Sequence, residues 1–236
     1  MPDDPAALTA ALGAAYGGIT AVVADLDDSD LLLPTGCRGW LVVDLLLHLT
    51  GDAQRALVAF ATPAAGPADV DAAGYFRGFG PAGEGQAGEA QAGHAPAAHA
   101  RWIRRSAAAF DRPGGVVRLW RDTAPAAVRA AAAADPTATV GTQGHVLTVG
   151  DFVATLVTEA AIHHLDLVTD LPGAPQPAPT ALAVALSTLD GLAAPGGLPP
   201  HWGQREALLK GTGREPLTGA DRSALGPRAA AFPLLG

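Results

Sequence analysis

Three side chains suited to metal binding or acid–base chemistry lie in one apolar stretch of the chain. The stretch from Thr148 to Asp170 reads TVGDFVATLVTEAAIHHLDLVTD and contains Glu159, His163 and Asp166. At about 100° per residue, Glu159 and His163 lie about 40° apart on a helix surface, and Asp166 lies about 20° from Glu159. A carboxylate and an imidazole at this spacing can hold one divalent metal ion, but a third ligand must come from another element.

A single helix is expected to position these side chains. Thr148 and Asp151 have the spacing of a helix start, and Leu171-Pro172-Gly173 is a stop signal. The predicted helix has about 22 residues and is roughly 33 Å long. Buried polar groups on it must be satisfied, and a hydrogen-bonded Glu159–His163 pair without metal is the alternative interpretation. His164 points to another side of this helix, where we expect it to be structural or exposed.

A second helix is predicted from about Val42 to Thr62, and it offers the missing ligand. Its inward-facing positions are Leu41, Leu45, His48 or Leu49, Asp52, Ala56 and Phe60. Helical bundles build metal sites from side chains on facing helices, so His48 is the best third ligand. Two imidazoles and one carboxylate leave coordination positions open, as in catalytic metal sites. Asp166 is either a hydrogen-bonding partner of a ligand histidine or a polar residue near the helix end. Asp44, one turn before His48, has the same two interpretations, of which an exposed side chain is favoured.

The remaining pattern favours an all-α fold. Further helices are predicted over about 5–26, 96–111, 124–134 and 180–193, and the buried positions of the helix at 96–111 are expected to be Trp102, Ile103 and Phe110. The glycine-rich residues 63–96 are expected to form a long loop or lid. We expect an antiparallel four-helix bundle over residues 1–173, and a helical C-terminal extension over residues 174–236 that packs on it.

Composition narrows the classes of partner and location. The net charge is −8, and no cluster of lysine and arginine is present, which argues against nucleic-acid binding. The start MPDDPAAL lacks the basic region of a secretory signal, and the longest apolar run, 40–49, is too short to span a bilayer. Cys37 is the single cysteine, so no intrachain disulfide can form, and it is expected to be a small buried residue. We expect a cytoplasmic protein, monomeric or homodimeric, without a membrane partner.

Three segments of the chain resemble the DinB-like, mycothiol-dependent metalloenzymes, the family typified by mycothiol-dependent maleylpyruvate isomerase. They are CRGWLVVDLLLHL at 37–49, EAAIHHLD at 159–166, and the tail TGREPLT at 212–218 with its ending FPLL at 232–235. The first two segments together are fairly specific. The resemblance extends from about residue 8 to the end of the chain.

The resemblance implies a DinB-like four-helix bundle with a divalent metal, usually zinc, bound by His48, Glu159 and His163. It also implies chemistry with mycothiol, a low-molecular-weight thiol that a metal ion deprotonates near neutral pH. The family's maleylpyruvate isomerase has an added C-terminal domain with an active-site arginine. Arg214 is the candidate for such a cofactor-binding residue here.

Three functions follow as expectations. The first is a metal- and mycothiol-dependent S-transferase, which adds a thiolate to a small electrophile. The second is a mycothiol-dependent cis–trans isomerase of a maleylpyruvate-like diacid. The third is a non-catalytic bundle that binds a small ligand or a partner and has lost the chemistry.

Overall fold

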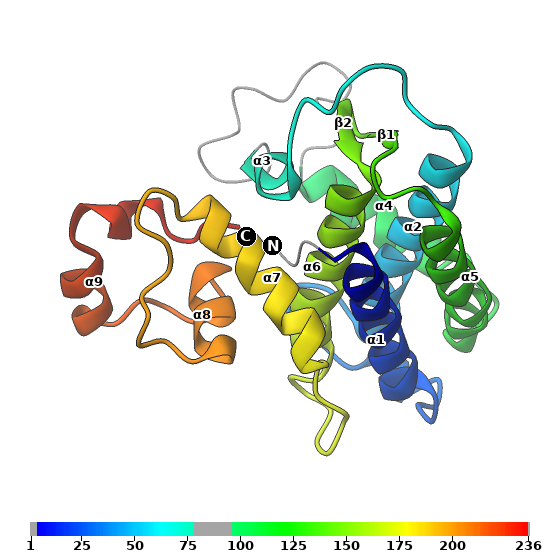
Figure 1. Ribbon diagram of the computed structural model, residues 1–236. Helices are drawn as coiled ribbons and strands as arrows, with labels where there is room; N and C mark the ends of the chain where they lie inside the picture. The colour runs from blue at the N-terminus through cyan, green and yellow to red at the C-terminus, as the bar shows by residue number, and fades with distance from the viewer. Residues whose placement is uncertain (1–3, 78–95, 236) are drawn as a thin grey trace.

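Four long helices form the core of the molecule, which is described here from a computed structural model over residues 4–77 and 96–235. These helices are α1 (Pro5–Val23), α2 (Val42–Ala61), α5 (Gly114–Ala133) and α6 (Val149–Leu167) (Figure 1). Helix α1 packs against α5 and α6, and α2 packs against the same two helices, which closes a ring of four. The expected all-α four-helix bundle is confirmed.

The first bundle helix is apolar along most of its length. Asp4 caps it by accepting a hydrogen bond from the backbone N–H of Ala6 at 3.0 Å. Of the described helices, α1 alone has the length and mean hydropathy (1.6) that would suit a membrane span, criteria that a buried core helix also meets. Leu12 and Ile19 are fully buried in the bundle core, so packing against α5 and α6 accounts for this apolar composition.

The start of helix α2 is stabilised by a capping hydrogen bond that the sequence interpretation missed. The Asp44 carboxylate accepts a hydrogen bond from the backbone N–H of Leu41 at 3.0 Å, which fixes the first turn of the helix. Asp44 is only 4% exposed, so the expectation of an exposed side chain is wrong. Its place one turn before His48 therefore reflects capping of the helix start.

The third bundle helix is longer than the sequence indicated. The predicted helix 96–111 is observed as α4 (Pro96–Ala107). The predicted helix 124–134 is the second half of α5, which begins at Gly114 and contains Pro125. The sequence favoured a break because glycine and proline disfavour helix interiors. Burial of Trp120 outweighs those local preferences: its ring is fully buried, and its indole N–H donates to Thr20 at 2.9 Å.

Helix α4 lies against α2, outside the ring of four. Ile103 is buried as expected, and Phe110 is partly buried against the core. Trp102 is 54% exposed, so the expectation that it is buried is wrong. Between α2 and α4, the residues expected to form a loop include the short helix α3 (Ala72–Arg77), and residues 78–95 of that segment lie outside the described residues.

A tight hairpin leads directly into the helix that carries Glu159 and His163. Strands β1 (Thr139–Thr142) and β2 (His145–Thr148) pair antiparallel, with Thr142 opposite His145. The turn residues Gln143 and Gly144 both have positive φ, of 47° and 83°, as a two-residue hairpin turn requires. Thr148 ends β2 and caps α6 by accepting a hydrogen bond from the N–H of Asp151 at 3.0 Å. The predicted start of this helix is thereby confirmed.

The C-terminal segment continues the helical architecture. Helix α7 (Pro179–Leu192) packs against α6 and α1, and α8 (Gln204–Gly211) packs against α7. The short elements η1 (Asp30–Leu32), α9 (Gly219–Leu225) and η2 (Gly226–Ala231) complete the described fold. Helices α8 and α9 lie to one side of the bundle in Figure 1. The division into units 1–173 and 174–236 stays a prediction.

Candidate metal centre

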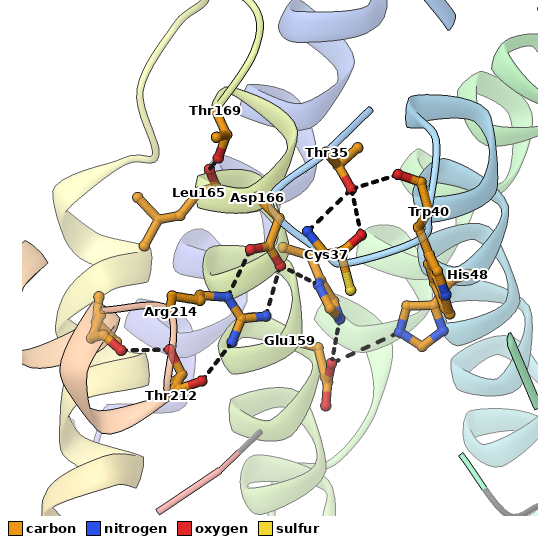
Figure 2. Close-up of polar contacts among 12 residues, drawn as sticks. Thr35, Cys37, Trp40, His48, Glu159, Leu165, Asp166, Thr169, Thr212 and Arg214 are labelled. Carbon is orange, nitrogen blue, oxygen red and sulfur yellow. Dashed lines mark hydrogen bonds and ion pairs between the residues drawn. The ribbon is translucent and has the colours of Figure 1, made fainter. Parts of the chain in front are cut away.

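The neighbouring helices α2 and α6 bring the three predicted ligands together. Glu159 Oε2 lies 3.2 Å from His163 Nε2 and 3.9 Å from His48 Nε2. One ligand atom from each of the three residues lies within 4.8 Å of the other two. In Figure 2 a dashed line joins the Glu159 carboxylate to the His48 ring. Periodicity placed Glu159 and His163 on one face of a helix, and the structure adds His48 from the facing helix.

The protonation equilibria of this cluster show how strongly its members interact. Burial by itself raises the pKa of Glu159, but hydrogen bonds to His163 and His48 outweigh it and hold this pKa well below its ordinary range. Burial by itself lowers the pKa of His163, but Asp166 and Glu159 together raise it to about 9. Without metal, the proton on His163 is therefore stabilised by two carboxylates. A divalent cation binding at Nε2 replaces that proton in the same negative environment.

The donor set fits a divalent metal ion of the zinc type. Two imidazole nitrogens and one carboxylate oxygen are ordinary zinc ligands, and three protein ligands leave a position open for another molecule. The three side chains are 12–26% exposed, so the cluster lies at the edge of the core, where a small ligand can reach it.

A buried carboxylate fixes the orientation of His163. Asp166 is 2% exposed, and its Oδ2 lies 2.9 Å from His163 Nδ1. Metal-binding histidines commonly donate their second ring N–H to such a carboxylate, which fixes the tautomer and directs the other nitrogen at the metal. Asp166 thus has the geometry of the supporting role that its helix position suggested.

The tail of the chain reaches this site through Arg214. Its Nε and Nη2 donate to the two oxygens of Asp166, both at 2.7 Å, and its Nη1 donates to the carbonyl of Thr212 at 3.2 Å (Figure 2). Burial alone raises the pKa of Asp166, but hydrogen bonds from His163 and Arg214 reverse the sign and lower it. Arg214 therefore contacts the cluster through Asp166. A cofactor-binding role for it stays a prediction.

Two residues of the site were not recognised as functional from the sequence. His99, on α4, places its Nε2 3.4 Å from His48 Nδ1. Asp52 follows His48 by one turn on α2, and its Oδ2 lies 3.8 Å from His48 Nε2. Asp52 had a usable signal, since His48-x3-Asp52 repeats the spacing of Glu159-x3-His163 with the order of types reversed. No sequence signal identified His99, because its partner, His48, is on another helix.

Cys37 belongs to a second group of possible ligands, together with His163 and Asp166. Its side chain is partly buried, somewhat less than expected, and packs against the core. Burial and the charge of Asp166 raise the pKa of the Cys37 thiol to about 11. Both oxygens of Asp166 already accept from Arg214, whose positive charge opposes a cation. The His48–Glu159–His163 group is therefore the better metal site.

His164, the neighbour of the ligand, has a structural role. It is 1% exposed, and its Nε2 lies 2.9 Å from the carbonyl oxygen of Pro175. This contact ties α6 to the connector that follows it. Of the two expectations for His164, the structural one is confirmed.

Comparison with known protein families matches the N-terminal part of the chain. Residues 12–113 match the family model described as "Mycothiol maleylpyruvate isomerase N-terminal domain". The match includes α2 and His48 and ends before α6, which carries the other two members of the cluster. No match is found among curated proteins or among solved structures.

Proposed function

We propose that this chain, whose residues 12–113 belong to the mycothiol maleylpyruvate isomerase N-terminal domain family, is a metal-dependent S-transferase that adds the thiolate of mycothiol to a small electrophile. The observation that carries the proposal is the group of His48, Glu159 and His163, with ligand atoms within 4.8 Å of one another. We further propose that it works in the cytoplasm, as a monomer or homodimer.

The chemistry follows from a divalent cation, zinc being the first candidate, held by those three side chains. Such a cation, when bound, lowers the pKa of a thiol so that a reactive thiolate is available near neutral pH. Asp166 holds His163 in the tautomer whose Nε2 is free for the cation. Arg214 fixes Asp166, and His99 lies against the other ring nitrogen of His48. Asp166 and His99 thus contact the ring nitrogens of His163 and His48 that do not face the cation, and these contacts orient the two imidazoles.

Isomerisation of a maleylpyruvate-like diacid is the second candidate function. The name of the matching domain family, which refers to maleylpyruvate isomerase, favours it. Recognition of a diacid calls for cationic groups at the site, and Arg214 has two of its nitrogens on Asp166. Because Arg214 is already engaged with Asp166, it is less available to bind a carboxylate of a diacid substrate. The S-transferase needs no such group, so this pairing favours it.

Metal content and thiol turnover test the proposal together. Protein purified without chelator is analysed for bound metal and is incubated with mycothiol and a generic electrophile. We expect about one divalent ion per chain and thiol-dependent loss of the electrophile, with both reduced at least 100-fold in His48→Ala and His163→Ala. His201→Ala, which changes an exposed histidine outside the cluster, is the matched control. Equal turnover by His163→Ala and wild type would contradict the site.

The same experiment separates the other functions. An isomerase converts the diacid without net consumption of thiol, whereas a transferase consumes one thiol for each electrophile. A non-catalytic bundle shows neither activity, and less than one metal ion per several chains would favour that reading.

A further inference from the structure

The candidate metal centre contains a second pair of imidazole and carboxylate at i, i+4 spacing. On α6 the pair is Glu159 and His163, and on α2 it is His48 and Asp52. His48 Nε2 lies 3.8 Å from Asp52 Oδ2 and 3.9 Å from Glu159 Oε2. The nitrogen expected to bind the cation is thus nearly equidistant from two carboxylates, one from each helix.

The two oxygens of Asp52 have different surroundings. Oδ1 accepts a hydrogen bond from Arg55 Nη1 at 2.8 Å. Oδ2 is fully buried and has no hydrogen-bond partner among the described residues. Leaving a buried charged oxygen without a partner is costly, so such an atom in a native structure calls for an explanation. The oxygen without a partner is the one that lies near His48 Nε2.

We propose that Asp52 is a further ligand of the cation, so that α2 and α6 each contribute one imidazole and one carboxylate. The inference rests on the metal-binding part of the proposed function and does not depend on the thiol. Asp52 is outside the group whose ligand atoms all lie within 4.8 Å of one another, so ligation by its free oxygen requires that oxygen to come closer to the other three donors than it lies here. Arg55 contacts the other oxygen of Asp52, so this hydrogen bond does not occupy the oxygen proposed as the ligand atom.

A fourth protein donor changes the chemistry of the site. Two carboxylate oxygens and two imidazole nitrogens form a harder donor set than two imidazoles and one carboxylate. Manganese(II) favours oxygen ligands more strongly than zinc does, so Asp52 contributes more to its binding. Glu159 and Asp52 also bring two carboxylates to the site, although Asp52 shares its charge with Arg55, which it contacts at 2.8 Å.

Metal affinity and the spectrum of bound cobalt test this inference without any measurement of activity. In Asp52→Asn the amide oxygen still accepts from Arg55, while the carboxylate charge near His48 is lost. Metal-free protein is titrated with Zn²⁺ and Mn²⁺ against a chromophoric chelator, and the visible absorption of the Co²⁺ form is recorded. We expect zinc binding to weaken about 10- to 100-fold, manganese binding to weaken more, and the cobalt spectrum to change in intensity and position.

Asp44→Asn is the matched control, because Asp44 is equally buried on the same helix and only caps its start. It should bind both metals as wild type does. Equal affinities and identical cobalt spectra for wild type and Asp52→Asn would overturn the inference and leave the proposed function intact. A wild-type protein that binds no divalent cation would overturn both. If Asp52→Asn does not fold, Asp52→Glu replaces it: the displaced carboxylate should still change the cobalt spectrum, and an unchanged spectrum would overturn the inference.

Discussion

The two imidazoles of the candidate metal centre are held in place by different means. His163 is backed by a buried carboxylate at 2.9 Å, which Arg214 fixes through two hydrogen bonds of 2.7 Å. His48 is backed by another imidazole, His99, at 3.4 Å, and its ring packs edge-on against Trp40 with a centroid distance of 5.3 Å. One ligand is therefore fixed by charge and the other mainly by packing. Charge-assisted hydrogen bonds are the stronger restraint.

The largest effect is expected where this charge is removed. Asp166→Asn takes the carboxylate from between His163 and Arg214 and leaves the guanidinium with a neutral partner. We expect metal affinity to fall about 10- to 100-fold, and the free energy of unfolding to fall by about 3 kcal/mol, because breaking a buried ion pair leaves one charge uncompensated. Chelator competition and denaturant unfolding measure the two quantities.

Asp135→Asn provides the control for this substitution. Asp135 is an exposed carboxylate that binds Thr137 within its own turn. Its loss should leave metal affinity unchanged. If Asp166→Asn binds metal as tightly as wild type does, the inference that this carboxylate orients His163 for metal binding is wrong.

The pH dependence of metal binding should report the charged surroundings of His163. The pKa of His163 is raised to about 9, and a cation must displace its proton below that value. Apparent affinity should therefore rise about tenfold per pH unit up to about pH 9, and then level off. Competition titrations between pH 6 and pH 10 measure this slope. A flat profile between pH 6 and pH 9 would show that no proton is displaced.

The same pKa has a consequence for the stability of the metal-free protein. A histidine whose pKa is higher in the folded than in the unfolded state stabilises the fold when it is protonated. This contribution is fully present below about pH 6.5 and is lost as the pH rises through about 9. We expect the loss to be at most about 3 kcal/mol. Metal-free His163→Gln should lack this decline, which can be followed by denaturant unfolding at each pH.

A smaller effect is expected from the arginine that supports Asp166. Arg214→Lys keeps the positive charge but loses the planar fork that contacts both oxygens of the carboxylate. Metal affinity should fall about 3- to 10-fold, less than for Asp166→Asn. If Arg214 instead binds the thiol cofactor, KM for the thiol rises while metal affinity stays at the wild-type value. The two readouts together distinguish a positioning role from cofactor binding.

Much of the bundle was predictable because its helices carry local signals. The helix of Glu159 and His163 was expected over about 149–170 and is observed as Val149–Leu167, with Thr148 as its cap. Helix α5 was predicted only in part, because Gly114-Gly115 and Pro125 are local helix breakers. Its formation depends on the burial of Trp120 against α1, a long-range contact that no window of neighbouring residues contains.

The site shows the same limit. Helical spacing placed Glu159, His163 and Asp166 on one face, because the period of 3.6 residues per turn depends only on their positions in the sequence. That α2 faces α6 did not follow from periodicity. His48 was predicted because it lies at an inward-facing position of its helix, and the family resemblance implied the same residue. His99 was missed because its contact with His48 joins α2 and α4, whose relative position no local pattern encodes.

The smallest effect is expected at that contact, where packing carries more of the restraint than hydrogen bonding. His99→Phe keeps a ring of similar shape between Trp40 and Trp102 but removes the nitrogen that faces His48 Nδ1. Since a 3.4 Å contact is long for a hydrogen bond, we expect metal affinity to fall by about threefold or less. His99→Ala, which also removes the ring, should have the larger effect, by chelator competition. A loss in His99→Phe as large as in Asp166→Asn would mean that both imidazoles are fixed by hydrogen bonds of similar strength.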